Sequence, residues 1–142
     1  MPIRSVTVRV PAKVNLQLSV GPRELDGYHQ LVTVFQAISI FDDVIVRIAD
    51  PGFGIHLTVT GDQTHGVPTD ATNLVVQAAE LIAQKFEIDI DAHIEIKKSI
   101  PVAGGMAGGS ADAAAAIVAI NELFNLDMTL SLIHISEPTR PY

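Results

Sequence analysis

Hydrophobic and polar residues alternate along much of the chain with a period of two, which is typical of β-strands that bury one face. Six segments show this alternation: residues 6–10, 14–20, 33–40, 43–48, 55–60 and 92–98. Pro11 is expected to end the first strand, because proline cannot donate a backbone hydrogen bond. Phe41-Asp42 is expected to connect the third strand to the fourth. The pattern therefore predicts several antiparallel neighbours.

Two later segments have the period of an α-helix instead. Their hydrophobic residues at helical spacing are Leu74, Ala78, Leu81, Ile82 and Phe86 in the first, and Ala113, Ile117, Ile120 and Phe124 in the second. We expect these helices to begin near Asn73, with Asp70 or Thr72 as the cap, and near Ser110. Strands and helices together predict a two-layer α+β domain in which both helices cover one face of a mostly antiparallel sheet.

Composition fits one domain and excludes several classes of function. The chain has 142 residues, 48% of them hydrophobic, and a net charge of −7 that argues against a nucleic-acid partner. It has no cysteine, no apolar run near the roughly 20 residues that span a bilayer, and a start, Met1-Pro2-Ile3-Arg4, unlike a secretory signal. The histidines lack the spacing of a zinc site. We therefore expect a cytoplasmic protein with no membrane partner and no metal held by protein ligands alone.

The most informative segment is Pro101-Val102-Ala103-Gly104-Gly105-Met106-Ala107-Gly108-Gly109-Ser110, which runs directly into the second predicted helix. Backbone N–H groups that lack neighbouring Cβ atoms can converge on an anion, and a helix N-terminus adds the positive end of its dipole. This glycine loop therefore predicts a phosphate site. A Walker P-loop is excluded because Ser110 stands where that motif has lysine, and Met106-Ala107 breaks the Rossmann pattern. A glycine turn that merely lets the helix pack against the sheet stays open.

Lys13, Tyr28 and His29 are candidates for ligand contact in the first part of the chain. Lys13 begins a predicted strand beside a tight bend and so holds a cation in a fixed place, although an ordinary solvated lysine is the alternative. Tyr28 and His29 close a polar loop side by side. They could grip a planar heterocycle, or they could be a turn tyrosine and a surface histidine.

Three charged residues flank the glycine loop. Lys97 and Lys98 arrive just ahead of it and are either phosphate contacts or a solvated strand end. Asp112 lies in the first turn of the helix that follows. Because a carboxylate there offsets the helix dipole, we prefer this interpretation of Asp112 to magnesium binding.

Three motifs, in this order and spacing, resemble those of the GHMP kinases. They are Pro11-Ala12-Lys13-Val14-Asn15-Leu16, Asp26-Gly27-Tyr28-His29 and the segment from Pro101 to Ala111. The glycine loop is common to that family, whereas the first two motifs resemble the branch that acts on a CDP-linked methylerythritol. The resemblance covers about residues 8–127 and implies the ribosomal protein S5 domain 2-like fold.

The resemblance implies ATP-dependent phosphorylation of the 2-hydroxyl of CDP-methylerythritol, a step of non-mevalonate isoprenoid biosynthesis, with Mg²⁺ bound through ATP. ATP would contact Pro101, Val102, Ala103, Gly104, Gly105, Met106, Ala107, Gly108, Gly109, Ser110 and Ala111. Lys13 would be catalytic, Asn15 and His29 would contact the substrate, and Tyr28 would stack on cytosine. The alternatives are another GHMP acceptor, homoserine or mevalonate, or a nucleotide-binding domain without catalysis.

The sequence also departs from this family. Its members are about twice as long and carry a catalytic aspartate in a Gly-Ala/Ser-Asp-Val-Pro segment that these 142 residues lack. We interpret residues 1–128 as an incomplete N-terminal, ATP-binding domain, and residues 129–142 as a non-family tail of artefactual origin. The chain is therefore expected to be an inactive fragment of a kinase.

Overall fold

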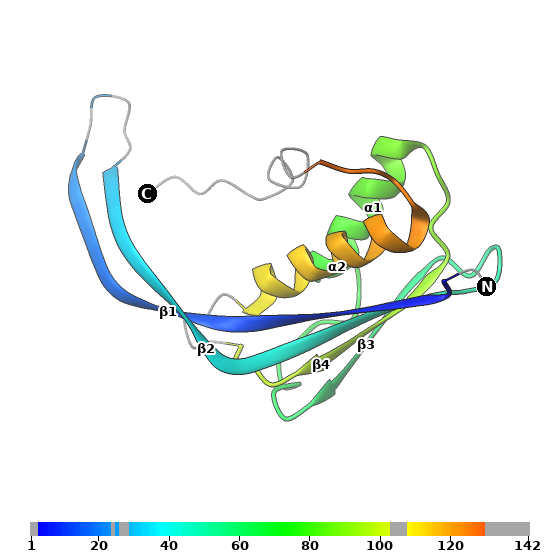
Figure 1. The fold of residues 1–142 in the computed structure, drawn as a ribbon, viewed down its shortest axis with the longest axis horizontal. Coiled ribbons are helices and arrows are strands. Elements are labelled where there is room, and N and C mark those ends of the chain that lie inside the picture. Colours follow the sequence, from blue (N-terminus) through cyan, green and yellow to red (C-terminus); the bar gives the residue numbers. More distant parts are fainter. Residues whose placement is uncertain (1–2, 24, 26–28, 103–107, 130–142) are drawn as a thin grey trace.

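The computed structural model describes residues 3–23, 25, 29–102 and 108–129, and within residues 15–23 and 29–35 it describes the backbone path alone. Its elements are β1 (Ser5–Arg23), β2 (His29–Ile48), β3 (Ile55–Gly61), α1 (Leu74–Phe86), β4 (Ala92–Lys98) and α2 (Gly108–Phe124). Both helices lie on the same face of the sheet (Figure 1). The predicted two-layer α+β architecture is confirmed. None of the described helices has the length and apolar character needed to cross a membrane.

The sheet is mixed, with strand order β1-β2-β4-β3. β2 pairs antiparallel with both β1 and β4, whereas β3 and β4 are parallel. Parallel neighbours need a long crossover, and the connection that contains α1 supplies it. Because β3 and β4 are parallel, their C-terminal ends lie side by side. The start of α1, which follows β3, therefore lies near the end of β4, where the glycine loop begins.

The two predicted breaks in the first strands are wrong. β1 continues through Pro11 and β2 continues through Phe41 and Asp42, so that four predicted strands form two long ones, which extend together beyond the rest of the sheet (Figure 1). Pro11 pairs with Phe41, but the next residue, Ala12, pairs with Ile38. This register shift is a bulge, and β1 is an edge strand, so the sheet tolerates a residue that has no N–H to donate.

The core lies between the sheet and the two helices. Alternation along β4 buries Ala92, Ile94 and Ile96, and α2 brings small side chains such as Ala116 and Ala119 against the sheet. Because these side chains are small, the helix backbone can lie close to the sheet.

The residue that caps the start of α1 is not one of the two predicted. Asn73 itself is the N-cap, because its side-chain oxygen accepts a hydrogen bond of 2.8 Å from the N–H of Val75. Asp70 instead accepts from the N–H of Thr72 at 2.9 Å, in the turn before the cap. The cap places Asn73 at the same end of the molecule as the glycine loop.

Candidate functional site

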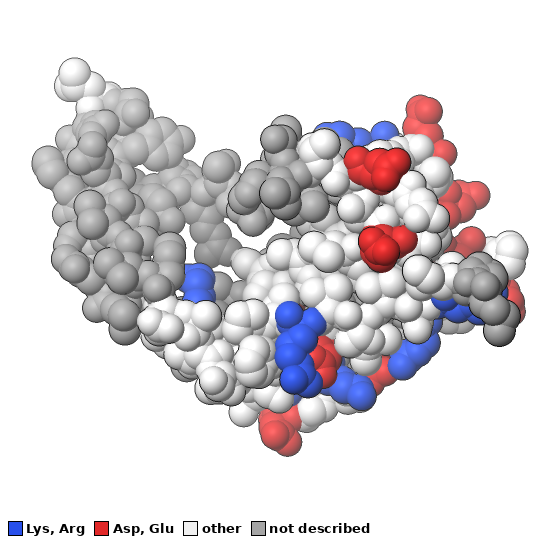
Figure 2. Space-filling model, viewed as in Figure 1, with Lys and Arg blue, Asp and Glu red and all other residues white. Residues whose placement is uncertain are grey.

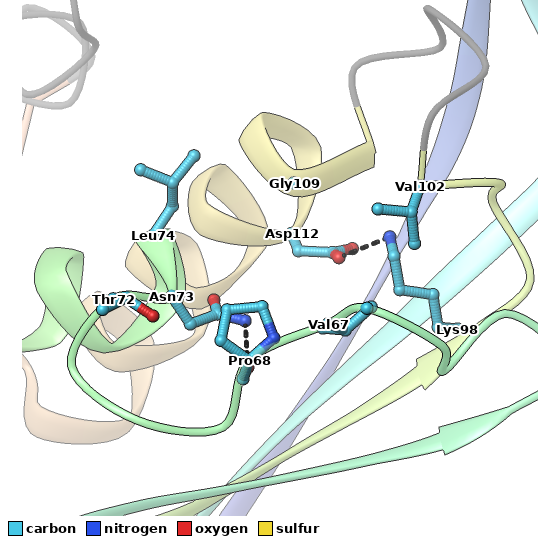
Figure 3. Close-up of a pocket in the computed structure, with 10 residues that line it drawn as sticks. Val67, Pro68, Thr72, Asn73, Leu74, Lys98, Val102, Gly109 and Asp112 are labelled. Atoms are coloured by element: carbon cyan, nitrogen blue, oxygen red, sulfur yellow. Dashed lines mark hydrogen bonds and ion pairs between the residues drawn. The ribbon is translucent and has the colours of Figure 1, made fainter.

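Three ionisable side chains meet between the end of β4 and the start of α2, and we refer to Asp42, Lys98 and Asp112 as the buried charge cluster. The Lys98 Nζ atom lies 2.7 Å from Asp42 Oδ2 and 2.9 Å from Asp112 Oδ2. Figure 3 shows the contact between Lys98 and Asp112. All three side chains are at least 97% buried. One ammonium group therefore donates hydrogen bonds to two carboxyl groups that are shielded from water.

Asp42 also fixes the backbone that leads into the glycine loop. Its Oδ1 atom accepts hydrogen bonds from the N–H of Ser99 at 2.7 Å and of Ile100 at 2.9 Å. These are the first residues after β4. A single carboxylate on β2 thus holds both the Lys98 side chain and the chain that follows it.

Gly108, the first residue of α2, lies against the same cluster. A Cβ atom there would lie 2.8 Å from Lys98 Nζ and 3.0 Å from Ile100 Cγ2, closer than side chains pack. Glycine at this position therefore allows Lys98 to reach Asp112 at the start of α2.

Burial and charge set the protonation of the cluster. Burial, together with the neighbouring Asp42, raises the pKa of Asp112 to about 8, and Lys98 offsets this in part. Burial would also raise the pKa of Asp42, but hydrogen bonds from Asp112, Lys98 and the two backbone amides lower it. Burial opposes the charge on Lys98, yet the two carboxyl groups raise its pKa. At neutral pH, Asp42 and Lys98 are therefore ionised and Asp112 carries a proton.

A cavity of about 200 Å³ opens beside this cluster, between the starts of α1 and α2 (Figure 3). Its lining comprises Gly66, Val67, Pro68, Thr72, Asn73, Leu74, Lys98, Val102, Gly109 and Asp112. The apolar groups are those of Val67, Pro68, Leu74 and Val102, and the polar groups are those of Thr72, Asn73, Lys98 and Asp112. The volume is below the roughly 300–1,000 Å³ of whole ligand sites, so the cavity would hold one part of a larger molecule.

The structure describes some of the predicted ATP contacts and not others. Ala103, Gly104, Gly105, Met106 and Ala107 lie outside the described residues. Val102 and Gly109, on either side of them, both line the cavity. Ser110 and Ala111 lie in the first turn of α2, and Pro101 follows the buried Ile100.

The predicted catalytic and substrate residues lie on β1 and β2. Lys13 is half-buried on β1 and pairs in the ladder with Ala37, and α2 packs against the same strand. Asn15 pairs with Phe35, and His29 begins β2, but the side chains of Asn15 and His29 are not among those described. Tyr28 lies outside the described residues. Their roles stay predictions.

The solvated alternative for Lys98 is wrong, whereas Lys97 is exposed. The dipole interpretation of Asp112 misses its contact with Lys98 in the core. Asp42 was expected in a connection rather than in the core. The sequence did carry a signal for Lys98, because it continues the buried alternation of Ala92, Ile94 and Ile96.

Mixed charges also occur on the outer face of the sheet (Figure 2). Arg9 and Asp43 pair at 2.8 Å across β1 and β2, and Arg47 and Glu95 pair at 3.2 Å across β2 and β4. Among the described residues, no group of three or more His, Asp or Glu side chains is arranged to hold a metal ion. The outer face therefore offers paired surface charges, and the cavity is the better candidate site.

Comparison with known proteins shows which family the chain resembles. Residues 73–138 match the GHMP kinases N terminal domain. A protein of Kineococcus radiotolerans named 4-diphosphocytidyl-2-C-methyl-D-erythritol kinase is 54% identical over 132 residues, and one of Mycobacterium avium with the same name is 56% identical over 128. These alignments cover 92% and 90% of this chain. The chain spans 40% of the length of each of these relatives.

Solved structures agree with the sequence comparison. A crystal structure of 4-(cytidine 5'-diphospho)-2C-methyl-D-erythritol kinase matches with a TM-score of 0.71 and 30% identity, covering 94% of this chain and 46% of that one. Homoserine kinase from Cytophaga hutchinsonii has the same fold, with a TM-score of 0.69 and 22% identity over 92% of this chain and 39% of that one. In sequence and in fold, the chain thus matches the N-terminal part of the GHMP kinases.

Proposed function

We propose that this chain is the nucleotide-binding part of an ATP-dependent kinase that phosphorylates the 2-hydroxyl of CDP-methylerythritol. The observation that carries the proposal is the identity of 54–56% to kinases of that name over at least 90% of the chain. The cavity supports it, because it lies where the two flanks of a glycine loop and two helix starts meet. Helix starts of this kind favour bound phosphate.

One part of an ATP molecule would suit the residues that surround this cavity. The lining offers apolar groups of Val67 and Pro68 to a flat, weakly polar ring, while Gly109 at the start of α2 faces the same space. The glycine loop and the first N–H groups of α2 would hold the triphosphate. Phosphoryl transfer relies on such positioning and charge stabilisation rather than on a covalent intermediate.

The roles proposed for the residues that bind the phosphate acceptor come from the resemblance to the GHMP kinases. Lys13 would stabilise the negative charge that develops on the acceptor hydroxyl, Asn15 and His29 would bind the substrate, and Tyr28 would stack on cytosine. Mg²⁺ would be bound mainly through the phosphates of ATP, as this ion commonly is. When bound, ATP supplies the transferred phosphoryl group.

Measurements of ATP binding and of ADP release test two separate parts of this proposal. We expect the 142-residue polypeptide to bind ATP, measured by calorimetry, but to release no ADP in a coupled assay with CDP-methylerythritol. The loss of an acid–base group alone typically lowers rates by about 10²–10⁴-fold, and the aspartate segment implied by the family is not among these residues. Saturable ADP release that depends on the acceptor would contradict this expectation.

Substitution of Tyr28, the aromatic residue proposed to recognise the acceptor, tests the identity of the acceptor. In a protein that contains this chain and binds its acceptor, Tyr28→Ala is expected to weaken binding of CDP-methylerythritol by about 1–3 kcal/mol, the usual value of base stacking. Phe at the same position keeps the ring and should retain most of the affinity. Equal binding by the Tyr28→Ala variant would favour homoserine or mevalonate as the acceptor.

A further inference from the structure

The cavity has two walls that come from different parts of the chain. Residues before and at the start of α1 form what we call the α1-side wall, and residues of the first turns of α2 form the α2-side wall. The α1-side wall comprises Gly66, Val67, Pro68, Thr72, Asn73 and Leu74, and the α2-side wall comprises Gly109 and Asp112. Lys98, at the end of β4, also lines the cavity.

Lys98 is connected to both walls, through two different groups. On the α2 side, its ammonium group donates a hydrogen bond of 2.9 Å to Asp112. On the α1 side, its backbone carbonyl accepts hydrogen bonds from the N–H of Asp62 at 3.1 Å and of Gln63 at 3.3 Å. Asp62 and Gln63 begin the segment that leads from β3 to the α1-side wall.

Gly61, the last residue of β3, allows this segment to approach Lys98. It pairs with Lys98 in the parallel ladder and has a φ of +101°, which side chains other than glycine rarely adopt. A Cβ atom at Gly61 would overlap the carbonyl oxygen of Lys98 and lie 2.8 Å from its backbone nitrogen. Because β4 lies between β2 and β3, these backbone atoms cannot move aside as the end of a side chain can. A side chain at position 61 would therefore push the following segment away from Lys98.

Hydrogen bonds within this segment would transmit such a displacement to the cavity. The N–H of Val67 donates to the carbonyl of Thr64 at 3.2 Å. The side chain of Asn73 donates to the carbonyl of Pro68 at 2.8 Å, which joins Pro68 to the N-cap of α1 (Figure 3). A shift at the start of the segment would therefore reach Val67 and Pro68, which line the cavity.

We propose that Gly61 and Lys98 are positioning residues for nucleotide binding, because their contact sets the distance between the two walls of the cavity. The backbone of Lys98 holds the α1-side wall, and its ammonium group holds the α2-side wall through Asp112. This inference rests on the proposed function, in which a flat ring lies against Val67 and Pro68 and the triphosphate binds at the start of α2.

The proposal predicts different effects on two ligands. Mg²⁺-ATP would contact both walls, whereas Mg²⁺-tripolyphosphate has a chain of phosphates without the nucleoside and would need the α2 side alone. Displacement of the α1-side wall should therefore weaken binding of Mg²⁺-ATP and leave binding of Mg²⁺-tripolyphosphate unchanged. Partial unfolding would instead weaken both to the same degree, because the folded chain is the form that binds.

The test measures both dissociation constants by calorimetry for Gly61→Ala and Gly52→Ala, with circular dichroism to determine the folded fraction. Gly52 is the matched control, because it also has a positive φ, +89°, and lies in the turn before β3. A Cβ atom at Gly52 would meet none of the described atoms within 4 Å beyond its chain neighbours. We expect Gly61→Ala to weaken Mg²⁺-ATP by about fivefold or more, the lower end of ordinary coupling between two positions. Gly52→Ala should bind both ligands as the unaltered chain does.

Two results with a folded Gly61→Ala variant would overturn the inference: unchanged affinity for Mg²⁺-ATP, or equal losses of affinity for the two ligands. If the variant does not fold, amide hydrogen exchange of the unaltered chain decides. Since coupling is reciprocal, Mg²⁺-ATP must then slow exchange at Asp62 and Gln63 more than Mg²⁺-tripolyphosphate does, and equal exchange with both ligands would overturn the inference. Absence of ATP binding by the unaltered chain would overturn the proposed function itself, and so differs from ATP binding that Gly61→Ala leaves unchanged.

Discussion

At Gly108 the site has no room for a side chain. Because an added Cβ would lie 2.8 Å from Lys98 Nζ, Gly108→Ala should force Lys98 away from Asp112. We expect a loss of about 1–3 kcal/mol in the free energy of unfolding, measured with urea, as is usual for overpacking. Gly109→Ala is the matched control, since its Cβ would meet Leu74 Cδ1 at an ordinary 3.9 Å. A control as unstable as Gly108→Ala would contradict this explanation.

Lys98 supplies the positive charge beside the two buried carboxyl groups of Asp42 and Asp112. Lys98→Met would leave Asp42 and Asp112 without their shared cation, and we expect it to lower the free energy of unfolding by about 3–5 kcal/mol. Lys97→Met changes the same charge at an exposed position one residue earlier, and should change stability by less than about 0.5 kcal/mol. Chemical denaturation of both variants compares them directly. Equal effects would mean that the buried pairs contribute little.

The cluster illustrates what local patterns predict about single residues. Lys98 shares the buried face of β4 with Ile94 and Ile96, and Asp112 lies one helical turn before the buried Ala115 and Ala116. Alternation and helical period place these two charges in the core, but neither pattern shows that they meet each other. Their partnership with Asp42, 56 residues from Lys98 along the chain, depends on strand pairing that one sequence does not reveal.

The helices and strands differ in how far local patterns determined them. Both helices and the strand that leads into the glycine loop lie where periodicity predicts them. The long strands β1 and β2 do not, because Pro11 and Phe41-Asp42 resemble chain breaks locally. Pairing with the opposite strand through a bulge overrides that local signal. Composition alone predicts a functional role for the glycine loop, whereas the cavity that Val102 and Gly109 line depends on the fold.

The start of α1 depends on a single capping residue. Asn73→Ala removes the acceptor for the N–H of Val75, and should lower the free energy of unfolding by about 1 kcal/mol. Gln84→Ala, an exposed change at the other end of α1, is the control and should have little effect. Thermal and urea unfolding measure both. A stability of Asn73→Ala equal to that of the control would mean that the cap is replaced by water or by Asp70.

At the scale of the whole molecule, Asp112 makes stability depend on pH in an unusual direction. Its pKa is about 8 in the folded chain against an ordinary 3.8, so the stabilising effect of its proton is complete below pH 3.8 and is lost as pH rises through about 8. Asp42, whose pKa is lowered, contributes in the opposite sense and below pH 3.8. The free energy of unfolding should therefore decrease between pH 4 and pH 8, by no more than about 5 kcal/mol.

Urea denaturation at a series of pH values measures this slope. Asp112→Asn should flatten it between pH 4 and pH 8, because the amide does not titrate. An unchanged slope in that variant would assign the dependence to other groups.

The central claim is that the space between the starts of α1 and α2, beside the glycine loop, receives ATP. The most direct measurement is a titration of the chain with Mg²⁺-ATP followed by the backbone amide signals in NMR spectra. The account predicts saturable shifts at one equivalent that are largest for Asn73, Gly109 and Asp112, which line the cavity. Shifts confined to the outer face of the sheet, around His93 and Glu95, or no saturable shift at all, would contradict it.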